Sequence, residues 1–212
     1  MVKELRSVFK TIKILFTLFC LFAGSDSYAA ALETIPSEGV LAEINLARSE
    51  PLTYAGFLRE RRRQFEGDSY TLAGTDIVLR SVEGPAAVDE AIDYLVGRKP
   101  VAPLVWSAGL AAAATELVEE QGKSGITGHS GRKSGAFLER VKKQGIQETW
   151  LGENIAYGLS SPREVIMALI IDDGVPSRGH RKNLFNKNFA KVGVSCGFHP
   201  RYEILCAIDF SD

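Results

Sequence analysis

The amino-terminal segment sets how much of this 212-residue chain can belong to a folded domain. Four basic residues lie within the first 13 positions, and no charged side chain occurs from Ile14 to Gly24. A helix that crosses a bilayer needs about 20 apolar residues, so this shorter run is typical of a secretory signal peptide. We predict a signal peptide at residues 1–31 and one domain at residues 32–212, exported to the extracellular space or the periplasm, with no membrane span after cleavage. The alternative is an uncleaved anchor.

The overall composition is that of a globular protein. Hydrophobic residues make up 45% of the chain and charged residues 24%, which excludes a disordered or low-complexity protein. The formal net charge is −1, so the chain lacks the basic excess that attracts polyanions. We therefore expect no nucleic-acid partner.

Two of the three cysteines lie outside the predicted signal peptide, at Cys196 and Cys206. Strand-like patterns at 192–198 and 203–210 flank a turn. If residues 200–202 form a three-residue loop, the two cysteines lie directly opposite each other in a hairpin. An exported chain favours a disulfide between them, and the alternative is two buried free thiols.

Apolar residues at helical spacing, together with residues that favour helix starts, predict a series of helices. A strand-like apolar run follows Gly152, and the glycine-punctuated stretch 67–84 is expected to be irregular. The expected helices begin at or beside Ser37, Pro51, Pro85, Ser107, Ser134 and Ser161.

A few polar residues are candidates for chemistry. His129 and His180 lie beside glycines in polar loops, where a core role is not expected, and Glu153 lies just before the strand-like run. Asp172 follows Val165 by seven positions, which places both on one face of the last expected helix. Two histidines and two acids can form a metal or acid–base site, and they can equally satisfy one another structurally.

Several short segments, taken in order, resemble motifs of the CAP superfamily, which includes cysteine-rich secretory proteins, venom antigens and plant pathogenesis-related proteins. Segments 44–48 and 104–110 match two further recurrent motifs of that superfamily. The main matching segments are Gly128-His129-Ser130, Gly152-Glu153-Asn154-Ile155-Ala156 and Gly179-His180-Arg181-Lys182-Asn183.

The resemblance covers the chain from about residue 37 to residue 210 and implies an α/β (α+β) fold. The expected architecture is an α-β-α sandwich, in which a small, largely antiparallel sheet lies between helical layers. We therefore expect residues 32–212 to form a single CAP (SCP) domain. The small number of cysteines is compatible with a bacterial member.

The resemblance also implies a central cavity lined by two histidines and two glutamates. These positions fall on His129, Glu153, Asp172 and His180, with aspartate in place of the second glutamate. The neighbouring Asp173 is an alternative for that position. Aspartate is one methylene shorter than glutamate, so this replacement could reshape a metal site.

Three functions remain open from the sequence. The first is binding of a small-molecule or lipid-like ligand. The second is a metal-dependent hydrolase, in which His129 and His180 hold a divalent metal such as zinc and Glu153 is the general base. The third is a structural or interaction module without catalysis. We favour binding over catalysis, because catalytic zinc usually has three protein ligands and only two imidazoles are available.

Overall fold

The computed structural model describes residues 35–72, 74 and 76–212. Residues Leu32–Asp212 form one compact unit. The predicted signal peptide at 1–31 lies outside the described residues.

A four-stranded sheet forms the centre of this unit. Its strand order is β4 (Val105–Trp106), β8 (Lys191–His199), β9 (Glu203–Ser211) and β7 (Leu151–Tyr157). All neighbouring strands are antiparallel except β4 and β8, which are parallel. The sheet is therefore largely antiparallel, as expected, and β7 forms one of its edges.

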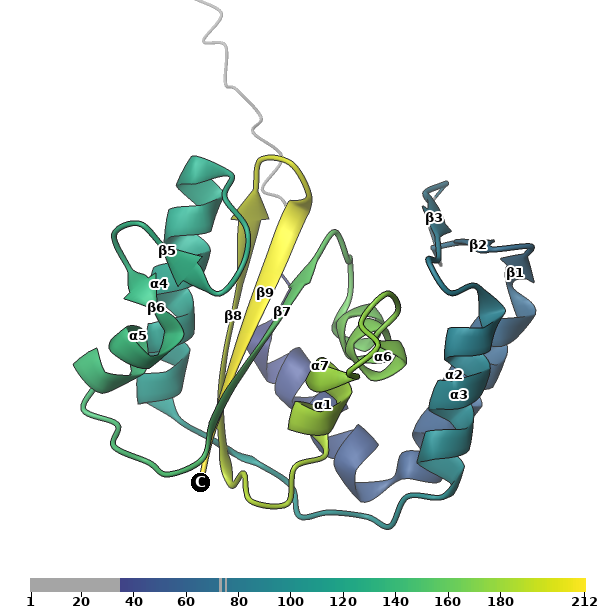
Figure 1. The fold of residues 1–212 in the computed structure, drawn as a ribbon, viewed down its shortest axis with the longest axis horizontal. Helices are drawn as coiled ribbons and strands as arrows, with labels where there is room; N and C mark the ends of the chain where they lie inside the picture. Colours follow the sequence, from purple (N-terminus) through teal and green to yellow (C-terminus); the bar gives the residue numbers. More distant parts are fainter. Residues whose placement is uncertain (1–34, 73, 75) are drawn as a thin grey trace, which may run out of the picture. The chain divides into compact units, whose positions relative to one another are not determined.

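Helices cover both faces of this sheet (Figure 1). On one face, α4 (Ala108–Ser124) packs against β8 and β9, and α5 (Phe137–Lys143) packs against α4. On the other face, α1 (Ser37–Ser49) packs against β8, whereas α6 (Pro162–Ile171) and α7 (Gly179–Leu184) pack against β7. The predicted α-β-α sandwich is confirmed.

A second pair of helices lies beyond α1 and α6. The helices α2 (Pro51–Arg63) and α3 (Pro85–Val96) pack against each other, α2 also contacts α1, and α3 contacts α6. A small antiparallel sheet of β1 (Phe65–Glu66), β2 (Ser69–Thr71) and β3 (Val78–Arg80) connects them. The prediction of an irregular segment at 67–84 was wrong for β2 and β3. These strands are too short to show an alternating apolar pattern.

The predicted helix starts are correct where a serine side chain caps the first turn of the helix or a proline lies in that turn. The Ser107 and Ser161 hydroxyls accept hydrogen bonds from the backbone N–H groups of Leu110 and Glu164, each at 3.3 Å. The helix expected at Ser134 begins instead at Phe137. A short β5–β6 ladder, formed by Ser130–Gly131 and Gly135–Ala136, precedes that helix.

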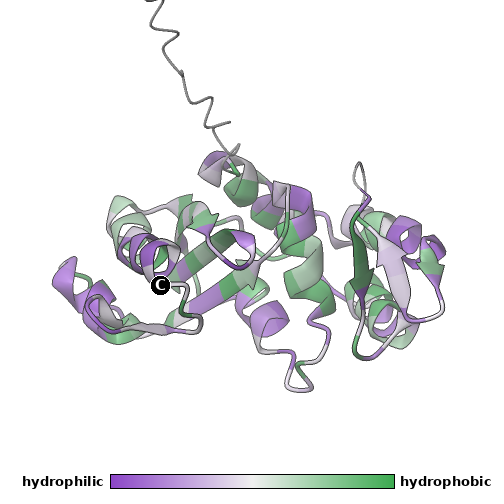
Figure 2. Cartoon of the chain, turned by 90° about the horizontal axis from the view of Figure 1, so that it is seen from above, coloured by the Kyte–Doolittle hydropathy of each residue, from purple (hydrophilic) through white to green (hydrophobic). Residues whose placement is uncertain are grey.

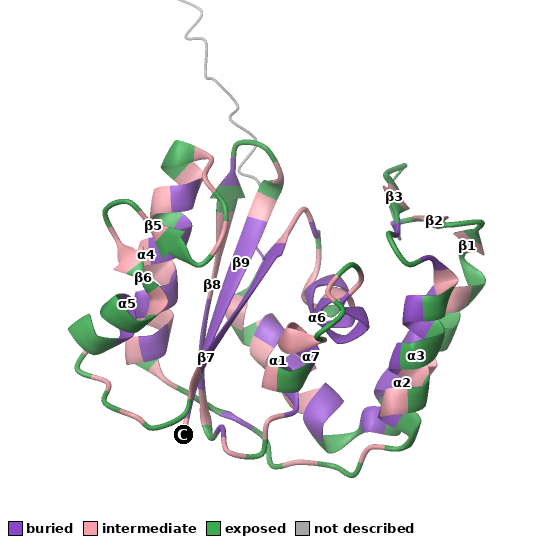
Figure 3. Ribbon diagram, in the orientation of Figure 1, coloured by how far each residue is buried: buried purple, intermediate pink, exposed green. Residues whose placement is uncertain are grey.

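The apolar core continues from the sheet into the helices. Figure 2 shows hydrophobic and hydrophilic residues alternating along the helices, and Figure 3 shows buried residues along β7 and β9. The main cluster joins α1, α6, α2 and α3 to one face of the sheet. A smaller cluster on the opposite face contains Ala114, Leu117, Ile155 and Ala207.

The carboxy-terminal hairpin has the predicted register. Cys196 lies opposite Cys206, and His199 lies opposite Glu203. The two cysteines are joined by a disulfide, with their Cα atoms 4.1 Å apart. The alternative of two free thiols is therefore not observed.

Candidate functional site

The first polar pair joins His129 to Glu153 on β7. The His129 ring lies on the loop that follows α4, and its Nδ1 is 2.8 Å from Oε1 of Glu153. The other carboxylate oxygen, Oε2, accepts a hydrogen bond from Arg140, whose side chain is fully buried on α5. Arg140 also donates to the carbonyl groups of Ala113 and Gly135. Glu153 is therefore held between a buried cation and an imidazole.

The contact with Glu153 changes the pKa of His129. The hydrogen bond to Glu153 raises the pKa of His129 above its usual value, and partial burial opposes this shift. The imidazole is 55% exposed, whereas the Glu153 side chain is 2% exposed. The pair therefore joins a buried anion to a ring that solvent can reach.

The second polar pair joins Asp172 to His180. Oδ1 of Asp172 is 2.6 Å from Nδ1 of His180. Oδ2 of Asp172 accepts hydrogen bonds from the backbone N–H groups of His180 and Arg181, at 2.9 and 3.3 Å. One carboxylate thus orients the His180 ring and satisfies the first turn of α7, whose N–H groups have no partner within the helix.

The structure corrects two expectations about this pair. Helix α6 ends at Ile171, and Asp172 is its C-cap with a left-handed φ of 56°. Asp172 therefore does not continue the helical face of Val165. His180 was expected in a loop, but it lies on α7. The short helix was missed because its segment contains glycine and polar residues and lacks an apolar repeat.

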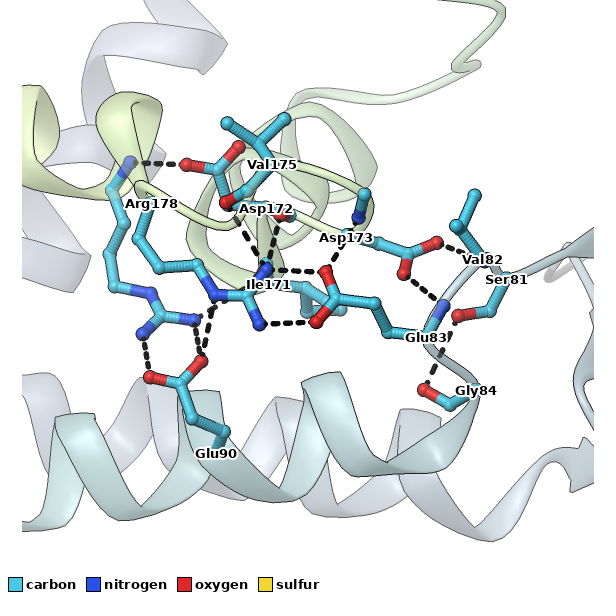
Figure 4. Close-up of polar contacts among 12 residues, drawn as sticks. Ser81, Val82, Glu83, Gly84, Glu90, Ile171, Asp172, Asp173, Val175 and Arg178 are labelled. Atoms are coloured by element: carbon cyan, nitrogen blue, oxygen red, sulfur yellow. Dashed lines mark hydrogen bonds and ion pairs between the residues drawn. The ribbon is translucent and has the colours of Figure 1, made fainter.

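The neighbouring Asp173 has a different role. Its carboxylate accepts hydrogen bonds from the backbone N–H groups of Val82 and Glu83, at 2.7 and 2.8 Å. Figure 4 shows Asp173 directed toward this segment. The acid that contacts His180 is therefore Asp172.

An ion-pair cluster holds the loop between α6 and α7 against α3 (Figure 4). Arg178 pairs with Glu83 at 2.6 Å and with Glu90 at 3.1 Å. Arg181 pairs with the same Glu90 at 2.6 Å. The hydrogen bond from Arg178 lowers the pKa of Glu83 to about 2. The cluster secures the segment that presents His180.

The edge strand β7 connects the two pairs. Successive strand residues point to opposite faces. Glu153 contacts His129, and the next residue, Asn154, donates to the carbonyl oxygen of His180 at 3.0 Å. Asn183 donates to Oδ1 of Asn154 at 2.9 Å. Asn183 and Arg140 were not among the residues predicted from the sequence. The signal for Asn183 was its place in the family motif at residues 179–183.

A cavity of about 250 Å³ lies where β7, α6, α3 and the small sheet meet. Asp172 and His180 line this cavity, whereas His129 and Glu153 are not among its lining residues. The structure thus brings the four predicted residues into two pairs that strand β7 connects, and it places one pair at the cavity. The lining is formed by Phe65, Tyr70, Arg80, Ser81, Val88, Ile155, Ala156, Tyr157, Leu159, Ala168, Leu169, Ile171, Asp172, Asp173, Val175 and His180.

Tyr157 links this cavity to the loop that carries His129. Its hydroxyl donates to Oε1 of Gln121 at 2.8 Å and accepts from the backbone N–H of Gly128 at 3.0 Å. Gln121 donates in turn to the carbonyl oxygen of Gly128 at 2.6 Å. Tyr157 therefore lines the cavity and holds the residue immediately before His129.

The side chains that could bind a metal ion are few in the described part of the chain. Among the described residues, no three His, Cys, Asp or Glu side chains gather where they could hold a metal ion. His129 and His180 each contact a carboxylate through Nδ1, which is the outer-shell arrangement of many metal-binding histidines. Nε2 of His129 and of His180 would be the ligand atoms. These two imidazoles are fewer than the three protein ligands usual for catalytic zinc.

Comparison with known proteins identifies the family. The description of the matching family is "Cysteine-rich secretory protein family" (CAP), and the match covers residues 41–208. The chain belongs to the CAP family. The motifs that carry His129, Glu153 and His180 all lie within the matched residues of this CAP domain.

Individual relatives match smaller parts of the CAP domain. The uncharacterized protein YkwD of Bacillus subtilis (strain 168) is 39% identical over 66 residues, which are 31% of this chain and 24% of that protein. The chain thus spans about a quarter of that relative's length.

In the described part of this chain, no helix combines the length and apolar character required to cross a membrane.

Two solved structures are similar at low sequence identity. An extracellular protein containing an SCP domain from Bacillus anthracis str. Ames is 20% identical, with a TM-score of 0.45 over 60% of this chain and 38% of that chain. An outer surface protein from Borrelia burgdorferi is 19% identical, with a TM-score of 0.44 over 51% of this chain and 77% of that chain.

Proposed function

We propose that this CAP domain is exported and binds a small, partly apolar ligand in the cavity beside β7. The observation that supports this function is the combination of a largely apolar lining with a few polar side chains. Side chains such as Phe65, Val88 and Leu169 supply apolar surface, and the Asp172–His180 pair supplies polar atoms. Ligand pockets typically combine an apolar lining with a few placed polar groups.

The size of the cavity limits the ligand. Its volume of about 250 Å³ lies just below the range of pockets for drug-sized ligands, which is about 300–1,000 Å³. The expected occupant is a compact molecule or one end of a longer, lipid-like molecule. Nε2 of His180 is the polar atom best suited to orient it, since Nδ1 already contacts Asp172.

The contacts of Glu153 favour binding over hydrolysis. A general base needs an oxygen within reach of the proton that it removes. One oxygen of Glu153 contacts His129 and the other contacts Arg140. The carboxylate therefore orients His129. If a divalent cation such as zinc binds, it would bind Nε2 of His129 and His180, and Glu153 would act on His129 alone.

The test is to fill the cavity and measure what the exported protein carries. Ala168 lies on α6 and lines the cavity, so Ala168→Phe places an aromatic ring in it. Ala86→Phe, at an exposed position of α3, is the matched control. We expect native mass spectrometry to show a bound small molecule on the wild type and on Ala86→Phe, and its loss from Ala168→Phe.

Thermal unfolding of each variant confirms that the fold is intact. Equal occupancy of Ala168→Phe and the wild type would contradict binding in this cavity. A wild type that carries no molecule, even after extraction with organic solvent, would favour the structural or interaction role.

A further inference from the structure

Asp209, opposite Glu153 in the sheet, carries a buried carboxylate that receives no hydrogen bond from the described residues. Asp209 on β9 lies directly opposite Glu153 on β7 and Gly193 on β8. Its exposed fraction is 0%. Within the described ranges, neither carboxylate oxygen of Asp209 receives a hydrogen bond from an N–H or O–H group. An ionised carboxylate in such a place is strongly disfavoured.

If Asp209 and Glu153 are both ionised, the charges around Asp209 do not balance. The charged groups that act on it are Glu153 from β7 and Arg140 from α5. Gly193 on β8 has no side chain, and α4 lies so close that an added Cβ would be 2.0 Å from the backbone nitrogen of Ala111. The α4 residues in the hydrophobic clusters are Leu110, Ala113, Ala114, Leu117 and Val118, and the buried polar residue of α4, Gln121, is uncharged. Two carboxylates therefore share one buried cation.

The cation Arg140 is hydrogen-bonded to acceptors other than Asp209. The Arg140 guanidinium donates to Glu153 and to the carbonyl groups of Ala113, His129 and Gly135. No Arg140 donor is directed to Asp209, whose carboxylate neighbour is Glu153. A hydrogen bond between two carboxyl groups requires one proton, and Asp209 is the carboxyl group without another partner.

We propose that Asp209 is a neutral carboxylic acid that donates its proton to the Glu153 carboxylate and thereby positions Glu153 against His129. Burial, followed by the negative charge of Glu153 and the hydrogen bond to it, raises the pKa of Asp209 well above its usual value. Asp209 is a positioning residue, since it acts on the histidine only through Glu153. This role is independent of whether the cavity binds a ligand.

The pH dependence of unfolding tests this assignment. A carboxyl group with a raised pKa in the folded state stabilises the fold below its unfolded pKa of about 3.9, and this stability is lost as pH rises through the folded pKa. Between those values, one bound proton makes the unfolding equilibrium constant rise about tenfold per pH unit. We expect Asp209→Asn to remove this contribution, whereas the exposed Asp93→Asn control retains it.

A second measurement needs no variant. In wild-type protein labelled with carbon-13 aspartate, we expect the Asp209 carboxyl carbon to keep the chemical shift of its protonated form at neutral pH. Titration of Asp209 together with the exposed aspartates would overturn the proposal. A folded Asp209→Asn variant with the wild-type pH dependence of unfolding would do the same.

Discussion

The Nδ1 atom of His180 lies 2.6 Å from Oδ1 of Asp172, and the other oxygen of this carboxylate accepts the N–H groups of the first turn of α7. One buried side chain therefore sets both the position of the short helix and the orientation of the ring that it carries. The equivalent role for His129 is divided between Glu153, which contacts the ring, and Arg140, which holds Glu153.

Removal of the Asp172 carboxylate should destabilise the fold. Asp172→Ala leaves the His180 ring and two backbone N–H groups without their acceptor. We expect a loss of about 1–3 kcal/mol in the free energy of unfolding, measured by urea denaturation. The exposed Asp93→Ala should change it little. Equal stability of Asp172→Ala and the wild type would show that this capping contributes nothing.

Removal of Arg140 should have a larger effect than removal of an exposed arginine. Arg140→Met leaves the buried Glu153 without its cation, which typically costs about 3–5 kcal/mol. Arg59→Met, at an exposed position of α2, is the matched control. In a double-mutant cycle, Glu153→Gln should recover part of the loss, since no buried charge remains. Strict additivity of the two substitutions would contradict direct coupling.

The pKa of His129 should depend on Glu153. The hydrogen bond to Glu153 raises this pKa in the folded state. The pair therefore stabilises the fold fully below the unfolded histidine pKa of about 6.5, and this contribution is lost as pH rises through the raised folded value. Proton NMR titration should show a lower His129 pKa in Glu153→Gln. An unchanged value in that variant would refute the assigned cause.

Zinc binding should require both histidines if the cation is held between them. Isothermal titration calorimetry should show weaker binding to His129→Ala and to His180→Ala than to the wild type. Binding requires neutral imidazoles, so the affinity should fall with decreasing pH, beginning above pH 6.5 because the pKa of His129 is raised. The metal role fails if the wild type binds no zinc at micromolar concentration, or if neither variant changes the affinity.

The disulfide should contribute to stability through the hairpin that it closes. The two cysteines are ten residues apart, and the chain-entropy model assigns about 2–3 kcal/mol to a loop of this size. The Cys196→Ser/Cys206→Ser double variant should therefore unfold at a lower urea concentration. Thiol labelling of the denatured, unreduced protein should detect neither Cys196 nor Cys206, and labelling of both would contradict the bond.

The features that the sequence predicted correctly depend on residues close together in the chain. The Ser107 and Ser161 caps act on N–H groups three residues away. The pairing of Cys196 with Cys206 follows from the length of one turn. Short family motifs contain three of the four candidate site residues, His129, Glu153 and His180, because each motif is a local pattern.

Tertiary structure alone decided how those residues pair and what supports them. Arg140 reaches Glu153 because α5 packs against α4, and Asp209 lies opposite Glu153 through strand pairing across 56 positions of sequence. Asp172, the C-cap of α6, meets the first turn of α7 only in the folded chain. Local propensity cannot specify such contacts, because the energy of a buried charge depends on which distant element supplies its partner.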